Sequence, residues 1–150
     1  MPGSFRLLPL ACSIALAVGC GSSPPLLRGA IKAEATSNPD LRGRPSPIVV
    51  RVYELKSLAA FNGADFFSLF EKEQETLGSE LLGREEYQLL PAETRPYQRQ
   101  LQPDTKFLGV VAAFRDLENS RWRSAVPVPP KRSVTLTIDI EARAVTVAVK

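Results

Sequence analysis

SVTLTIDIEARAVTVAV, residues 133–149, carries the clearest structural pattern in this sequence of 150 residues. Apolar side chains occupy every second position over 134–140, and serine, threonine and aspartate stand between them. The alternation pauses over 141–144 and resumes with valines over 145–149. A period of two is typical of strands that bury one face. The segment therefore predicts a β-hairpin at the C-terminal end.

Further strands are expected on the N-terminal side of this hairpin. Their ranges are 31–36, 48–55, 87–90, 97–101, 106–114 and 122–128. The second and fifth are apolar at nearly every position, which is typical of central strands. Pro91 and Pro96 restrict the two short ranges beside them to sheet edges or bends, because proline cannot donate to a neighbouring strand. About eight strands predict a mostly β fold, a two-sheet β-sandwich.

A helical period appears between the second and third of these strands. Asp65 can cap a helix and Gly78 can end one, so we expect a helix over about 65–76. Aromatic side chains, Phe66 and Phe70 among them, lie on one face of that helix. Aromatic residues at this spacing are more often packed on a sheet than exposed, and an exposed binding ridge is the alternative. The sequence thus predicts a small helical insertion.

The first twenty residues, MPGSFRLLPLACSIALAVGC, predict a signal peptide. Arg6 precedes an apolar run over 7–18 that is too short to cross a bilayer, which takes about 20 residues. The small residues before Cys20 resemble a bacterial lipobox, so we expect a lipid on the Cys20 thiol. Ordinary cleavage that leaves Cys20 free is the alternative. Gly21, in place of an aspartate, implies the outer membrane by the sorting rule for such lipoproteins.

The expected organisation has three parts. Residues 1–19 form the signal peptide, 20–29 a lipid-anchored tether and 30–150 the β-sandwich domain. The tether sequence GSSPPLLRG, at 21–29, is small and rich in proline, which is typical of a connection rather than of an element. Several acyl chains on Cys20 would hold the chain at a membrane without a spanning helix.

The composition argues against most kinds of catalysis. The sequence has no histidine and two cysteines, of which one leaves with the signal peptide and the other is the lipobox cysteine. Histidine is the commonest general base and a principal zinc ligand. We therefore expect no enzyme, no metal and no cofactor beyond the covalent lipid. A net charge of +3 is too small for a nucleic-acid footprint, so no nucleic-acid partner is expected.

The connection over 37–47 is the most distinctive polar segment of the chain. Its three prolines stiffen it, which lowers the entropy lost on docking. Leu41 is followed closely by Arg42 and Arg44, so an apolar side chain stands beside two long hydrogen-bond donors. Arginine is favoured at interfaces because its guanidinium binds carboxylates and also packs. From the residues alone, an ordinary connection between strands is the more common explanation, and a docking loop is the alternative.

An ordered set of motifs resembles one family. The set consists of the signal ending in Cys20, NPDLRGRPSPIVVRVYELKS at 38–57, ADFFSLFE at 64–71, LLPAE at 89–93 and FLGVVAAFRDLENSRWR at 107–123. Together these motifs resemble the TssJ (SciN) family, the outer-membrane lipoproteins of type VI secretion systems, over residues 30–150. The resemblance implies a transthyretin-like two-sheet β-sandwich with a small helical addition.

The same resemblance implies a function. Members of the family are anchored in the outer membrane, face the periplasm and bind the periplasmic C-terminal domain of TssM, with TssL in the same membrane complex. In the family the loop between the first two strands carries much of this contact. The implied partner-binding residues are Asn38, Pro39, Asp40, Leu41, Arg42 and Arg44. A lipoprotein that binds a small molecule or an envelope polymer in a sandwich cleft is the alternative.

Overall fold

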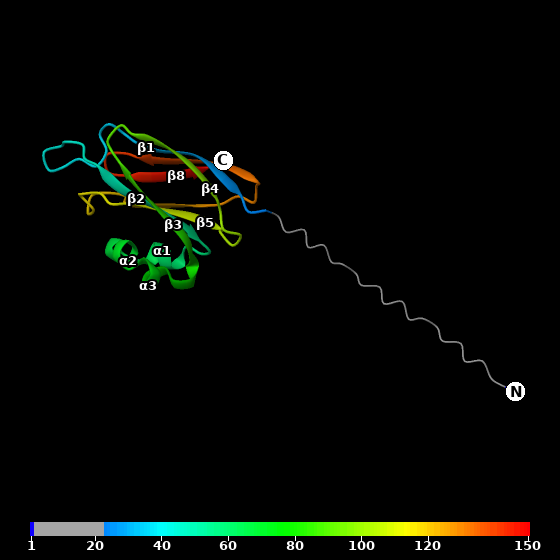
Figure 1. Cartoon of the computed structure of the whole chain (residues 1–150). Helices are drawn as coiled ribbons and strands as arrows, with labels where there is room; N and C mark the ends of the chain where they lie inside the picture. Colours follow the sequence, from blue (N-terminus) through cyan, green and yellow to red (C-terminus); the bar gives the residue numbers. More distant parts are fainter. Residues whose placement is uncertain (2–22) are drawn as a thin grey trace.

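Two packed β-sheets form the body of the protein (Figure 1). The computed structural model describes Met1 and residues 23–150, so nearly all of the predicted signal peptide and the predicted lipid site at Cys20 lie outside the described residues. Each sheet has four strands, and a small helical layer lies on the outside of one sheet. The prediction of a mostly β, two-sheet sandwich of about eight strands is confirmed.

The strand order explains the sequence patterns. The strands are β1 (Leu26–Ala33), β2 (Ile48–Leu55), β3 (Leu81–Leu89), β4 (Thr94–Gln100), β5 (Phe107–Ala112), β6 (Arg123–Pro127), β7 (Ser133–Ile140) and β8 (Val145–Val149). One sheet has the order β4-β1-β7-β8 and the other β3-β2-β5-β6. Neighbours are antiparallel except β1 and β7, which are parallel. The predicted hairpin is β7–β8, β2 and β5 are interior strands, and the proline-flanked β3 and β4 are edges, as expected.

Strand β1 begins earlier than its sequence predicts. The pairing with β4 and β7 starts at Leu26, and Leu27 is fully buried in the core, so residues 26–29 belong to the sheet and not to the tether. The sequence pattern does not show where this strand begins, because Gly29 interrupts the alternation of apolar residues. A Cβ at Gly29 would lie 1.7 Å from the backbone oxygen of Leu136 on β7, so the close approach of the two strands requires glycine there.

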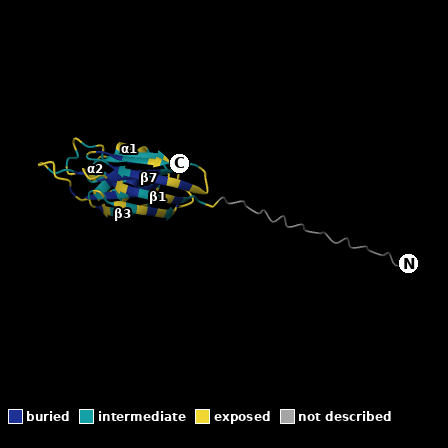
Figure 2. Cartoon of the chain, turned by 90° about the horizontal axis from the view of Figure 1, so that it is seen from above, coloured by how far each residue is buried: buried dark blue, intermediate teal, exposed yellow. Residues whose placement is uncertain are grey.

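Apolar side chains bury both faces of the β3-β2-β5-β6 sheet. Along β2, Val50 and Val52 belong to the core between the sheets, whereas Tyr53 and Leu55 belong to the core beneath the helices. All four are at most 2% exposed, which explains why 48–55 is apolar at nearly every position. Figure 2 shows the buried residues in dark blue along the strands of both sheets.

A buried ion pair joins the two sheets. Glu54 of β2 is 2% exposed, and its Oε1 accepts from Nε of Arg99 on β4 at 2.5 Å. Its Oε2 accepts from Thr105 Oγ1 and from the backbone N–H of Gln102, both at 2.7 Å. Because both carboxylate oxygens have partners, the charge can be buried without an unsatisfied acceptor.

The helical insertion consists of short pieces and not of the single helix predicted over 65–76. It contains α1 (Ala59–Gly63), α2 (Phe66–Glu71), α3 (Glu73–Leu77) and the 3₁₀ turn η1 (Gly78–Glu80). Asp65 caps α2 as predicted, accepting from the backbone N–H of Ser68 at 2.9 Å. The backbone carbonyl of Phe70 accepts from Arg51 of β2, and the helix breaks at Lys72. In a continuous helix the N–H of residue 74 would bond to that carbonyl, so this tertiary contact lies at the break.

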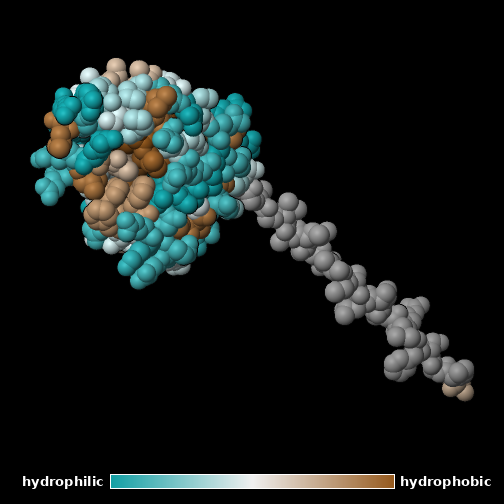
Figure 3. Space-filling view, turned by 60° about the vertical axis from the view of Figure 1, so that its left-hand side comes forward, coloured by the Kyte–Doolittle hydropathy of each residue, from teal (hydrophilic) through white to brown (hydrophobic). Residues whose placement is uncertain are grey.

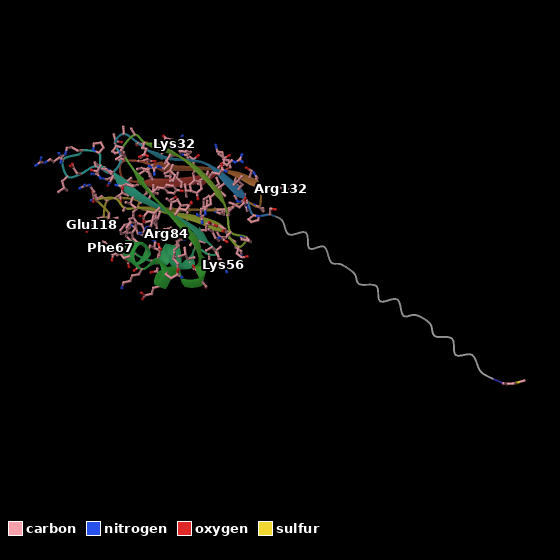
Figure 4. All side chains as sticks on the ribbon, in the orientation of Figure 1. Lys32, Lys56, Phe67, Arg84, Glu118 and Arg132 are labelled. Atoms are coloured by element: carbon pink, nitrogen blue, oxygen red, sulfur yellow. The ribbon has the colours of Figure 1, made fainter. Side chains whose placement is uncertain are left out.

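The aromatic face of the insertion packs on the sheet, as predicted, with one exception. Phe66 and Phe70 are half-buried against the core beneath the helices, and the Arg51 guanidinium lies 3.8 Å from the Phe70 ring centroid. Trp122, which precedes β6, packs edge-on against Phe66. Phe67 points outward and is 60% exposed (Figure 4). Among the described residues, no helix is both long and apolar enough to cross a bilayer.

Candidate functional site

The loop over 37–47 joins β1 to β2 at the end of the sandwich opposite to the one where the described chain enters at Ser23 (Figure 1). Its base is buried, because Ser37 and Asn38 are at most 2% exposed. The Asn38 amide donates to the backbone oxygen of Pro47 at 2.8 Å, and its Oδ1 accepts from the backbone N–H of Arg115 at 2.8 Å. Asn38 thus closes the loop and fastens it to the connection after β5.

Asp40 shapes the outer half of the loop. Its Oδ1 accepts from the backbone N–H groups of Arg42 and Arg44 at 2.8 and 3.0 Å, and its Oδ2 accepts from Arg44 Nε at 2.8 Å. Gly43, at φ 75°, provides the left-handed residue that closes the turn. The backbone and side-chain hydrogen bonds from Arg44 lower the pKa of Asp40 below its usual value. The carboxylate therefore stays ionised and keeps the turn in one conformation near neutral pH.

The tip of the loop consists of Leu41 and Arg42. Leu41 is fully exposed, and the side chain of Arg42 is exposed as well. Of the six predicted partner-binding residues, the structure thus places two at the tip. Pro39 is half-exposed at its side, Asp40 and Arg44 hold the turn, and Asn38 is buried in its base. Asn38 and Asp40 act on the loop's shape, and the exposed residues are the ones whose side chains are accessible to a partner.

Two hollows flank the tip. The larger is an open groove of about 770 Å³ between the loop and the connections after β5 and β7. The residues from those connections are Arg115, Asp116, Ala142 and Arg143. The smaller hollow is also lined by Arg115. Figure 3, in which the loop end comes forward, shows brown hydrophobic atoms among teal hydrophilic ones.

The charges around the tip do not cancel. Arg44 pairs with Asp40 at 2.7 Å, and Arg143 pairs with Asp116 at 3.4 Å. Over residues 23–150, the side chains of Arg42 and Arg115 have no carboxylate partner. The site is an exposed leucine beside two uncompensated cations, which suits an apolar contact bordered by carboxylates on a partner.

Sequence reasoning missed the contribution of the connections after β5 and β7. Arg115 and Asp116 lie within FLGVVAAFRDLENSRWR, where the sequence predicts strands but no binding residue. Arg115 meets Asn38 across 77 positions of sequence. The pattern of charges along a chain does not show which residues so far apart in sequence lie close in space. Only the fold could therefore place these residues at the loop.

The arrangement is open and accessible, as a surface suited to binding would be. The groove is lined by charged residues and lies outside the sandwich, whereas the space between the sheets is filled by apolar side chains. The deep apolar cleft expected of a small-molecule carrier is therefore not among the described hollows. Residues 23–150 and Met1 also contain no group of three or more His, Cys, Asp or Glu side chains that could hold a metal ion.

Comparisons with known proteins agree with this fold. Residues 26–143 match the family described as "Type VI secretion lipoprotein, VasD, EvfM, TssJ, VC_A0113". The T6SS lipoprotein TssJ1 from Pseudomonas aeruginosa is 37% identical, with a TM-score of 0.81 over 85% of this chain and 97% of that one. No match was found among curated proteins.

Two further solved structures are similar. Serratia marcescens Lip, a membrane-bound component of the type VI secretion system, is 27% identical, with a TM-score of 0.77 over 85% of this chain and 98% of that one. A chain of the structure named "T6SS protein TssM C-terminal domain" from EAEC is 25% identical, with a TM-score of 0.67 over 82% of this chain and 97% of that one. The family match covers β1 to the turn after β7, and on that ground the chain belongs to the TssJ (SciN) family of type VI secretion lipoproteins.

Proposed function

We propose that this protein is a non-enzymatic assembly factor that links a type VI secretion complex to the outer membrane. A lipid on Cys20 would hold it in that membrane, facing the periplasm. The tip of the 37–47 loop would bind the periplasmic C-terminal domain of a TssM protein, in a complex that also contains TssL. The observation that carries the proposal is the rigid display of Leu41 and Arg42 at the end of the sandwich farthest from the chain's entry.

The rigidity of the loop supports a docking role. Hydrogen bonds from Asn38 fix its base, and those to Asp40 fix its turn, so the tip loses little conformational entropy when it binds. The exposed Leu41 has no structural task in the isolated domain, because it contributes nothing to either core. The similarity to a chain of the TssM C-terminal domain structure supports TssM as the partner.

The partner is tested by calorimetry between residues 21–150 and the C-terminal domain of the cognate TssM. Leu41→Asp and Arg42→Glu should each weaken binding by about tenfold or more, because they remove an apolar contact or reverse a charge at the tip. Arg44 is the poorer choice for charge reversal, since Arg44→Glu would set two carboxylates against each other and disturb the turn.

The matched controls lie on the helical insertion. Phe67→Asp changes an exposed apolar residue and Lys72→Glu an exposed cation, far from the loop in sequence. Both should bind as well as the unmodified domain. Loss of binding in Phe67→Asp, with the loop variants unaffected, would move the interface to the helices. Failure of the unmodified domains to bind would contradict TssM as the partner.

The anchor is tested separately in the native host. Mass spectrometry of the mature protein should show acyl chains on Cys20, and Cys20→Ser should abolish recovery in the outer-membrane fraction. Secretion at the unmodified level by the Cys20→Ser strain would contradict an anchoring role, whatever the outcome of the binding measurements.

A further inference from the structure

The end of the sandwich opposite the loop carries a compact basic surface. A hollow of about 340 Å³ lies there, beside the point where the chain enters β1. Prolines, Val128 and three basic residues line it. The basic residues, which we call the basic rim, are Lys106, Lys131 and Arg132. No acidic residue is among the described residues that line this hollow.

The tether places the basic rim close to any membrane that holds the anchor. Ser23 lines the same hollow and lies three positions after Cys20 in the sequence. Three residues of fully extended chain span about 10 Å. That distance is close to the Debye length at physiological ionic strength, about 8 Å, so charges on the rim would act on the membrane surface.

From this placement we infer that the basic rim is a membrane-contacting surface that binds the phosphates of anionic lipid headgroups in the leaflet holding the anchor. The inference rests on the proposed lipid at Cys20 and adds a second contact to it. With the rim on the membrane, the long axis of the sandwich stands upright and the 37–47 loop points away from the bilayer (Figure 1). Figure 4 shows Arg132 at the end where the chain enters, with Lys32 and Glu118 away from it.

The rim side chains are free to bind phosphate. All three are exposed, and none has a salt bridge within residues 23–150. The acidic residue next in sequence to the hollow, Asp104, lies 3.8 Å from Lys56, so its charge is partly compensated. The Arg132 guanidinium can bind one phosphate through two N–H groups. Each basic residue near an anionic bilayer raises partitioning by about fivefold.

The apolar part of the hollow fits the same surface. Val128, Pro129 and Pro130 border the rim, and none of them is part of a strand. Pro129 and Pro130 have no backbone N–H. At the level of the headgroups they therefore leave no backbone hydrogen-bond donor without a partner. A small apolar patch surrounded by cations is the composition expected of a surface that rests on lipid headgroups.

The test uses the acylated protein in vesicles. Ser133→Cys, at the exposed residue next to Arg132 of the rim, and Leu41→Cys at the loop tip are labelled in separate samples with a fluorophore. Headgroup spin-labelled lipid serves as the quencher. Mass spectrometry of the same preparation reports whether Cys20 is acylated. In phosphatidylcholine vesicles with about a third phosphatidylglycerol, we expect strong quenching at residue 133, little at residue 41, and weaker quenching at 133 in pure phosphatidylcholine.

The matched variants separate the rim from the anchor. Lys131→Glu with Arg132→Glu should reduce about 25-fold or more the population of molecules whose rim contacts the membrane, and so lower the quenching at residue 133. High salt should lower the quenching of the unmodified protein in the same way. Lys32→Glu with Arg121→Glu makes the same charge change at two other exposed residues and should leave the quenching unchanged. Figure 4 shows Lys32 away from Arg132, and the backbone N–H of Arg121 bonds to Arg143, which lines the groove at the loop end.

The outcomes distinguish this inference from the proposed function. If the protein is acylated and residue 133 is quenched equally in all vesicles and variants, the inference that the rim binds anionic lipid is wrong and the proposed anchor stands. Equal quenching at residues 133 and 41 would also overturn that inference. Absence of the acyl mass on Cys20 would overturn the anchor itself, and the rim with it.

Discussion

Asn38→Ala tests whether the loop depends on its buried base. The substitution removes the donor to the Pro47 carbonyl and the acceptor for the Arg115 N–H, each at 2.8 Å. It also leaves an alanine at φ 51°, a left-handed conformation that asparagine tolerates better. The variant therefore loses two hydrogen bonds and strains the backbone at a residue that is 2% exposed.

The expected loss of stability follows from these three contributions. Each hydrogen bond is worth about 1 kcal/mol, and the left-handed alanine costs about 1 kcal/mol more. The free energy of unfolding should thus fall by about 3 kcal/mol, from a total that for most domains is about 5–15 kcal/mol. Asn38→Asp keeps the acceptor for Arg115 but sets a buried carboxylate oxygen against the Pro47 carbonyl, so it should also destabilise the domain.

Urea unfolding of residues 21–150 measures the loss. With a slope of about 1.5–3 kcal/mol per M, the midpoint for Asn38→Ala should fall by about 1–2 M. Leu41→Ala is the control, because Leu41 is fully exposed and its truncation should leave the midpoint unchanged. The same two variants should both bind TssM more weakly. A cost below about 1 kcal/mol for Asn38→Ala would refute the claim that this residue holds the loop.

Three further outcomes are expected. Gly29→Ala should destabilise the domain by at least about 3 kcal/mol in urea, because the new Cβ would meet the Leu136 backbone. Glu54→Gln should cost about 2–4 kcal/mol in the same assay, since Arg99 loses its buried counter-charge, and a neutral result would contradict this role. Burial raises the pKa of all three tyrosines, that of Tyr53 to about 12, so ultraviolet titration should show no native tyrosinate near pH 10. Because these folded-state pKa values exceed the unfolded value of 10, the contribution of the tyrosines to stability should be constant below about pH 10 and fall above it.

Most of the fold could be predicted from periodicity alone. The alternation over 133–149 gave the hairpin because each of its strands buries one face in the single core between the sheets. The strand over 48–55 is predictable as central from its apolar residues, because it buries both faces, one against the other sheet and one against the helices. Proline placed β3 and β4 at the edges, since a missing N–H is tolerated there.

The errors arose where a tertiary contact overrides the local pattern. Gly29 carries no side chain, so the alternation of β1 could not be followed back to Leu26. The helix predicted over 65–76 breaks at Lys72, where Arg51 of β2 donates to the nearby Phe70 carbonyl, and nothing in 65–76 signals a donor from a strand. For the site, the exposed tip could be inferred from composition and resemblance. The buried role of Asn38 could not, because its partner Arg115 is 77 residues away.

Strand β1 connects the two ends on which the proposed function depends. It starts at Leu26, beside the basic rim, and ends at Ala33, just before the 37–47 loop. Along this length it pairs with seven residues of β4 on one side and eight of β7 on the other. A pull between a lipid on Cys20 and a partner on Leu41 would therefore load both ladders in shear, and many hydrogen bonds would have to break together. An edge strand under the same pull would load only one ladder, so the interior position of β1 provides about twice as many hydrogen bonds against such a load.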